Sequence, residues 1–294
     1  MTDRHANDPK FDFYRTPERL ARKWISVSRV DVVLNCPWAY HAQYELGLER
    51  PPPSKAIVMG RLFDLMCEGV HSDKNIGKLF MTMGDLTDDE CELIHERYKT
   101  YEPSIPKPNT TQHPIELDLD YKGYWLMGFL DILPDDEGEP IIEVKFSQRP
   151  WSESKYKRKK FQATCYAEAM DRRPVRFDVS NYETDELQQW LVEPTKRAWT
   201  YARKRIIKAI DIIEGKACIK CGGKGSMYGE RENCTICGEP IFTRFNRTPT
   251  PGILCKGQRL DDDGEVLYDW QCDYYGVCPE QIKQREVREI AEHL

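Results

Sequence analysis

Residues 124–146 read YWLMGFLDILPDDEGEPIIEVKF, two apolar segments separated by a short polar one. The apolar segments, Tyr124 to Leu133 and Pro140 to Phe146, are rich in the aromatic and β-branched residues that favour strands. Asp135 to Gly138 has the residue types of a turn. The stretch therefore predicts two neighbouring antiparallel strands.

The flanking sequence extends this strand pair into an α/β pattern. Ile115, Leu117 and Leu119 alternate with polar residues and predict a further strand of the same meander. The remaining predicted elements are helices over residues 54–69, 87–101, 155–171 and 193–214, and a strand over residues 175–182. The order of elements is thus helices, antiparallel strands, helix, strand, helix.

Two segments carry helix-start signals. Thr87 and Glu90 have the spacing of a capping box. Nearer the N-terminus, Ser28 is placed as the N-cap of an earlier helix. Pro37 interrupts that helix, because proline lacks the N–H that a helix interior requires. We therefore expect two helical pieces with Cys36 at the joint.

The composition is that of a folded protein. The 294 residues are 40% hydrophobic and 31% charged, which argues against wholesale disorder. The N-terminus is polar, and no apolar run approaches the roughly 20 residues that cross a bilayer. These features predict a cytoplasmic protein without a membrane partner.

The central strand pair also brings charged side chains together. Alternate residues of a strand share a face, so Glu143 and Lys145 project together while Val144 points into the core. Asp131, on the neighbouring strand, can reach the same side. Two converging carboxylates repel each other unless a cation lies between them, and hard oxygen ligands suit Mg²⁺ or Mn²⁺. Such a cation can activate water and neutralise charge on a scissile phosphate.

A second polar pair follows on the next predicted helix. Gln162 and Tyr166 are four residues apart and hence on one face, where they can hold substrate or Lys145. Taken singly, these motifs are also consistent with a solvated strand face, since GxxD and ExK occur by chance in many strands. Together and in this order they indicate a metal-dependent phosphodiesterase.

A basic run lies between the strand pair and Gln162. Residues 149–160 read RPWSESKYKRKK, although the chain as a whole has a net charge of -6. A solvated helix face is the ordinary interpretation of such a run. Its position directly behind a phosphodiesterase motif favours contact with a nucleic-acid backbone.

With these motifs the chain resembles the RecB-type branch of the PD-(D/E)xK nuclease superfamily. That branch includes CRISPR-associated adaptation exonucleases, the AddB nuclease domain and phage exonucleases. The resemblance implies a restriction-endonuclease-like α/β core, a mixed sheet flanked by helices. It also implies roles for five residues: Asp131 and Glu143 as metal ligands, Lys145 as the catalytic lysine, and Gln162 and Tyr166 as the motif of this branch.

The resemblance extends upstream of the strands. The segment from Ser26 to Tyr44 is similar to the opening helix of the family. Gly60 to Asp64 matches the place where the family commonly has a glycine followed by a metal-binding histidine. Asp64 stands at the histidine position, and an aspartate can also bind a hard cation.

The cysteines point to metal ligation rather than disulfides, because their number, 11, is odd and the sequence has no secretory signal. Two CxxC pairs in a glycine-rich stretch indicate a closed, structural zinc site formed by Cys218, Cys221, Cys234 and Cys237. We expect this zinc-binding insertion over residues 216–254, with a DNA-gripping role as an alternative. Three further cysteines in helix-like apolar settings are expected in the core: Cys67, Cys91 and Cys165.

The resemblance further implies a 4Fe-4S cluster that ties the two ends of the nuclease core together, over residues 1–215 and 255–294. Cys36 resembles the early ligand, while Cys272 and Cys278, followed by proline, resemble the last two. In the family the remaining ligand usually forms a C-x2-C pair with the penultimate cysteine. No cysteine stands at that place before Cys272, and Cys255 is the candidate for the remaining ligand. Thiolates ligate such clusters. Buried or zinc-bound thiols are the alternative interpretation.

The sequence thus predicts a metal-dependent DNA nuclease, with an exonuclease favoured over an endonuclease, acting on DNA ends or single strands. A helicase or a recombination or adaptation protein is the expected protein partner, and phage recombination and CRISPR adaptation are both open as pathways. The first alternative is a non-cutting module that binds DNA or a helicase, against which the intact Asp131, Glu143 and Lys145 argue. The second is a redox or regulatory iron–sulfur protein.

Overall fold

The computed structural model describes residues 9–35, 37–40, 43–44, 53–68, 86–107, 109–214, 256–260 and 266–271. The chain divides into two compact units. The described residues up to 27 and those from 53 to 204 belong to the first unit, and the others belong to the second. All five residues of the two sequence motifs and Asp64 lie in the first unit.

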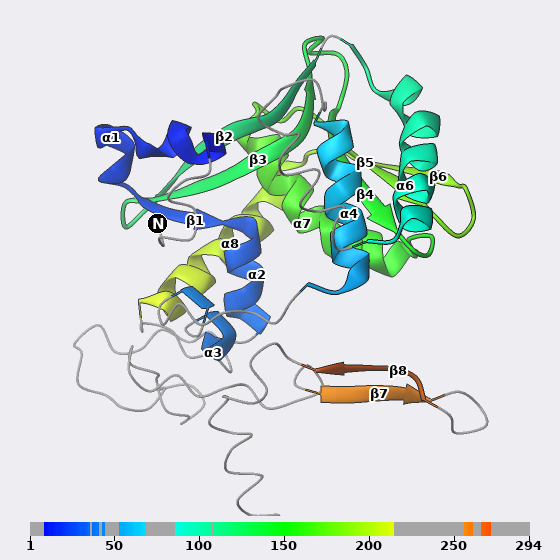
Figure 1. The fold of residues 1–294 in the computed structure, drawn as a ribbon. Helices are drawn as coiled ribbons and strands as arrows, with labels where there is room; N and C mark the ends of the chain where they lie inside the picture. Colours follow the sequence, from blue (N-terminus) through cyan, green and yellow to red (C-terminus); the bar gives the residue numbers. More distant parts are fainter. Residues whose placement is uncertain are drawn as a thin grey trace, which may run out of the picture. The chain divides into compact units, whose positions relative to one another are not determined.

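The first unit contains a mixed sheet (Figure 1). Its strands are β1 (Lys23–Ser26), β2 (Asn109–Tyr121), β3 (Tyr124–Pro134), β4 (Ile141–Ser147), β5 (Val175–Asn181) and β6 (Leu187–Val192). The path through the sheet is β1-β3-β4-β5-β6, and β2 also pairs with β3. β1 is parallel to β3 and β4 is parallel to β5, whereas the other pairs are antiparallel. The mixed sheet and the meander β2-β3-β4 confirm the predicted α/β core, whereas the predicted zinc-binding insertion over residues 216–254 lies outside the described residues.

The two edges of β3 are used unequally. β2 pairs with β3 along most of its length, from Tyr124 to Pro134. A strand has only two edges, so β1 and β4 must share the other one. β1 pairs there with residues 124–127, and β4 pairs only through Ile142 and Ile132. Between residues 127 and 132, this edge of β3 pairs with neither β1 nor β4. We call this unpaired stretch, where β1 and β4 diverge, the fork.

The helices follow the sequence signals with small shifts. They are η2 (Pro9–Arg15), α1 (Pro17–Leu20), α2 (Val27–Asn35), α3 (Pro37–Tyr40), α4 (Lys55–Cys67), α6 (Asp88–Tyr101), η4 (Glu102–Ser104), α7 (Glu153–Ala169) and α8 (Lys196–Ile213). The capping box of α6 is confirmed, because Glu90 N donates to Thr87 Oγ1 at 3.4 Å and Thr87 N donates to Glu90 Oε2 at 2.9 Å. The N-cap assignment of Ser28 is wrong. Strand β1 continues to Ser26 and α2 begins at once at Val27, so Ser28 is already helical.

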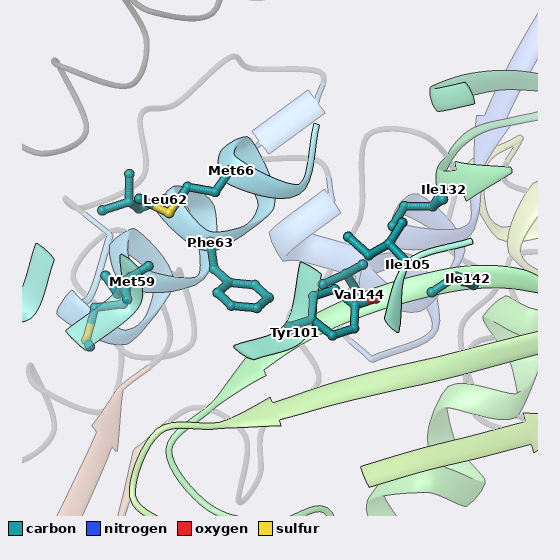
Figure 2. Packing of buried hydrophobic residues seen from close by; sticks show 10 residues of the cluster. Met59, Leu62, Phe63, Met66, Tyr101, Ile105, Ile132, Ile142 and Val144 are labelled. Carbon is teal, nitrogen blue, oxygen red and sulfur yellow. The ribbon is translucent and has the colours of Figure 1, made fainter. Parts of the chain in front are cut away.

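A hydrophobic cluster joins α4 and α6 to the sheet (Figure 2). Phe63 from α4 is fully buried, and its ring stacks on Phe146 of β4 with centroids 4.6 Å apart. Val144 belongs to the cluster and is 1% exposed, which confirms that it points into the core. Burying aliphatic and aromatic side chains of this size contributes about 1.5–3 kcal/mol each. This packing fixes α4 against the strand that carries Glu143 and Lys145.

The three core cysteines lie in the first unit, and none of the three forms a disulfide. Cys165 on α7 is fully buried, as predicted. Cys67 and Cys91 are half-buried and pack against the cluster between α4 and α6. All three therefore behave as small apolar residues.

In the second unit, Arg205 Nη2 of α8 donates to Asp31 Oδ1 of α2 at 3.2 Å. The same unit contains an antiparallel hairpin of β7 (Lys256–Leu260) and β8 (Val266–Gln271). No helix in the described part of the chain is long and apolar enough to span a membrane.

Candidate active site

The candidate site lies at the fork between β1 and β4. Asp131 sits on the part of β3 that neither strand pairs, just before Ile132. On the β2 side the ladder is also irregular here, since Gln112, opposite Asp131, has a φ of 49°. Left-handed backbone at a non-glycine residue is strained and concentrates at functional sites.

Side chains replace the missing ladder bonds of β3 and β4. Val144 N donates to Asp131 Oδ2 at 3.0 Å, and Asp131 N donates to Glu143 Oε1 at 3.5 Å. Buried backbone N–H groups require such partners. The divergence of the two strands thus turns the Asp131 and Glu143 carboxylates toward each other.

Lys145 completes this constellation. Its Nζ lies 3.0 Å from Asp131 Oδ2, 3.4 Å from Glu143 Oε2 and 2.6 Å from the carbonyl oxygen of Val144. Glu143 is 1% exposed, so its charge is compensated inside the protein and not by water. One ammonium group is therefore surrounded by three oxygens from the two strands.

The electrostatics of the site are dominated by burial and by excess negative charge. Burial raises the pKa of Glu143, and the charge of Asp131 raises it further. Burial alone would lower the pKa of Lys145, but the carboxylates of Asp131, Glu143 and Asp64 raise it above its ordinary value. Three carboxyl groups thus face a single ammonium group, an arrangement that favours additional positive charge.

Gln162 and Tyr166 reach the site from α7. Gln162 Nε2 donates to Glu143 Oε2 at 2.8 Å. Tyr166 is 8% exposed and packs over Gly128, where an added Cβ would lie 3.1 Å from Tyr166 Cε1. Burial raises the pKa of Tyr166, and the charges of Glu143 and Asp131 add to the rise. The structure therefore brings together all five residues of the two sequence motifs.

Asp64 approaches from α4. Burial raises its pKa, and the charge of Asp131 raises it further, whereas Lys145 lowers it. Asp64 thus lies within electrostatic reach of the other groups. Within the described ranges, however, no three His, Cys, Asp or Glu side chains are close enough together to hold a metal ion jointly. Asp64 and the carboxylates of Asp131 and Glu143 do not form a closed ligand set.

The donor set nevertheless suits a hard divalent cation. Asp131 Oδ2, Glu143 Oε2 and Val144 O already converge on a cation, the Lys145 ammonium. Carboxylate and carbonyl oxygens are the ligands that Mg²⁺ and Mn²⁺ prefer. The backbone oxygen of Val144 was not among the predicted site atoms, because side-chain motifs carry no signal for it.

The family model that matches the chain covers the whole of this region. It is described as the PD-(D/E)XK nuclease superfamily, and it matches residues 24–193, more than half of the chain. The chain belongs to the PD-(D/E)XK nuclease superfamily. The matched residues include α4, the fork and α7, and so every described residue of the candidate site.

Solved structures and curated proteins add little to this nuclease assignment. A structure from Eubacterium rectale described as a "putative exonuclease" has 15% sequence identity and a TM-score of 0.48, covering 67% of this chain and 84% of that one. A structure named SSO0001 has 13% identity and a TM-score of 0.37, covering 66% and 79%. No curated protein matches the sequence. The superfamily assignment therefore rests on the family model.

The cysteines predicted as metal or cluster ligands lie outside the described residues. They are Cys36, Cys255, Cys272 and Cys278 of the predicted iron–sulfur set, and Cys218, Cys221, Cys234 and Cys237 of the predicted zinc set. Both sets, and the insertion over residues 216–254, stay predictions.

Proposed function

We propose that the chain is a divalent-metal-dependent DNA nuclease, and more specifically an exonuclease acting on DNA ends or single strands. The observation that carries this proposal is the convergence of three oxygens on the Lys145 ammonium group at the fork in the sheet. They belong to the Asp131 and Glu143 carboxylates and the Val144 carbonyl. Membership of the nuclease superfamily supports it.

In this proposal each residue has a distinct task. Asp131 and Glu143, with Asp64 nearby, would hold Mg²⁺ or Mn²⁺, and such a cation would supply Lewis-acid chemistry: it would make a water more acidic and neutralise charge on the scissile phosphate. Lys145 donates hydrogen bonds to the attacking water or to the phosphate oxygens as they gain charge. Gln162 holds the Glu143 carboxylate in place through its 2.8 Å bond.

Tyr166 has a positioning task. Its ring rests on Gly128, three residues before Asp131 on the same strand, and its neighbours on α7 are buried. An aromatic ring held this rigidly fixes the distance between α7 and β3. We propose that Tyr166 thereby keeps Gln162 in reach of Glu143.

The cysteines are assigned in the same proposal from their spacing and from the family resemblance. Cys36, Cys255, Cys272 and Cys278 would ligate a 4Fe-4S cluster, and the two CxxC pairs between residues 218 and 237 would ligate structural zinc. Protein purified without air should then be brown and contain both iron and zinc. Metal analysis that finds zinc alone removes the cluster.

The nuclease proposal is tested with end-labelled linear and circular single-stranded DNA in Mn²⁺ and in EDTA. The full-length protein should degrade the linear strand only with Mn²⁺, and Lys145→Ala should lose this activity. Lys99→Ala is the matched control, because Lys99 is exposed and pairs with Glu96 on α6. Cleavage of the circle would identify an endonuclease. No metal-dependent cleavage, or equal cleavage by Lys145→Ala, would favour a non-cutting module that binds DNA or a helicase.

A further inference from the structure

Helix α7 continues past the candidate site and carries positive charge along the same side. Lys155, Lys159 and Gln162 are spaced i, i+4, i+7 and therefore share a helix face. All three are half-buried, whereas Lys157 and Lys160 are exposed. The helix thus presents two lysines on the side from which Gln162 reaches Glu143.

Strand β4 also carries polar side chains from the candidate site onward along one face. Glu143, Lys145 and Ser147 alternate along β4 and share one face. Gln162 Nε2 donates to Glu143 at one end, and Lys155 Nζ donates to Ser147 Oγ at 3.3 Å at the other. Helix α7 therefore runs along this face of β4, with Lys145 between its two contacts.

Lys155 is held in place without a negative partner. Its Nζ lies 5.1 Å from the centroid of the Trp151 ring, and Trp151 is 4% exposed. None of the ion pairs among the described residues includes Lys155. Burial lowers the pKa of Lys155, and the charges of Lys159 and Arg158 lower it further. A positioned ammonium among like charges is stabilised by an anion.

The distance to the candidate site fits a polymeric anion. Ser147 is two residues beyond Lys145, or about 7 Å along the strand. This spacing is comparable to that of successive phosphates in an extended single strand. A chain of net charge -6 repels nucleic acid in general, so a local cationic track has a large influence on where a strand can lie.

We propose that Lys155, with Lys159 beside it, binds the phosphate next to the scissile one on the same nucleic-acid strand. The inference rests on the proposed function, since it takes the scissile phosphate to lie at Lys145. It adds a second subsite, specific for the backbone of a continuing strand, to the residues that the sequence motifs supply.

The test compares Lys155→Gln with Lys157→Gln. Both substitutions remove one positive charge from α7, but Lys157 is 62% exposed and pairs with Glu153 at 2.8 Å. Binding of a fluorescent single-stranded oligonucleotide is measured by anisotropy in EDTA over a range of NaCl concentrations. Lys155→Gln should weaken binding several-fold and reduce the slope of log Kd against log salt by about 0.7, the value of one phosphate contact on a single strand. Lys157→Gln should leave the slope unchanged, and Lys155→Arg should restore binding.

A neutral methylphosphonate at single linkages locates the contact. Next to the cleaved linkage it should weaken binding by the wild type, and by Lys157→Gln, but cause no further loss in Lys155→Gln. Equal effects of the two Gln variants, with cleavage by the wild type intact, would overturn the subsite and leave the nuclease proposal standing. A wild type that neither binds nor cleaves DNA would overturn both.

Discussion

Gly128→Ala is the sharpest test of the way α7 and β3 meet at the candidate site. The backbone of Gly128 lies outside the left-handed region, so an alanine is not strained by its φ. An added Cβ would lie 3.1 Å from Tyr166 Cε1 and 3.4 Å from both Tyr166 Oη and Ile115 Cδ1. Ordinary carbon contacts begin near 3.4 Å, so the Tyr166 ring must move by a few tenths of an ångström.

The Tyr166 ring has little room for this movement. Four of its neighbours on α7, from Ala163 to Ala167, are buried along with it. Overpacking of such a contact costs about 1–2 kcal/mol, which lowers Tm by about 2–8 °C in a unit of this size. A displacement of about 1 Å near catalytic groups costs about 10²-fold in rate, so we expect a loss of about tenfold here. Thermal unfolding and cleavage of labelled single-stranded DNA measure the two effects.

Gly60→Ala is the matched control. Gly60 lies in α4, and an added Cβ there meets nothing within 4 Å. Alanine in a helix interior is favoured over glycine by about 0.5–1 kcal/mol, so this variant should gain stability where Gly128→Ala loses it. In a Tyr166→Ala background, Gly128→Ala should become nearly neutral, because the two effects are coupled. Wild-type stability and cleavage in Gly128→Ala alone would refute the contact between Tyr166 and Gly128.

Three further predictions concern stability. Arg176→Met removes both hydrogen bonds that Arg176 donates to the fully buried Asp178 carboxylate, at 2.7 and 2.9 Å, and leaves the one that Tyr101 Oη donates at 3.0 Å. It should lower the unfolding free energy in urea by about 3–5 kcal/mol; a loss below about 1 kcal/mol contradicts this. Thr87→Ala removes the helix cap of α6 and should cost about 1 kcal/mol in the same assay, whereas an unchanged urea midpoint speaks against the cap. Arg19 holds the pKa of Glu116 below its ordinary value of 4.5, so the ionised carboxylate stabilises the fold at neutral pH, and this contribution disappears as the pH falls through the lowered folded-state pKa. The Tm difference between wild type and Glu116→Gln should therefore shrink in acid, and a constant difference would rule out this pairing.

Much of the fold was predictable because its signals are local. The alternation of apolar residues gave β2, β3 and β4, and the capping box of α6 lies within four residues of the chain. The four residues KWIS show no period, so the sequence does not predict β1, which exists because β3 offers an edge 101 residues later. Edge strand β6 was missed as well, because its exposed face makes LQQWLV resemble a loop.

The candidate site likewise has features that the sequence predicts and features that it does not. Asp131, Glu143, Lys145, Gln162 and Tyr166 were predictable from strand and helix periods, and the structure brings them together. The burial of these residues could not be predicted, and neither could the hydrogen bonds from backbone N–H groups of β3 and β4 to carboxylates in place of carbonyls. Both depend on how β1 and β4 divide one edge of β3. The sequence motifs also carry no signal for the contact between Lys155 and Ser147. Ser147 does, however, continue the alternation of motif residues along β4.

The fork explains why a buried Glu143 is tolerable in this fold. A carboxylate that is 1% exposed costs several kcal/mol unless hydrogen bonds and charge compensate it. Here the compensation comes from three directions, because the strands diverge at this point: Asp131 N from β3, Lys145 Nζ from β4 and Gln162 Nε2 from α7. If β4 continued its ladder with β3, the backbone N–H groups would bond to carbonyls and Asp131 would have no reason to face Glu143. The same divergence that weakens the sheet therefore creates the set of oxygens that surrounds the Lys145 ammonium group.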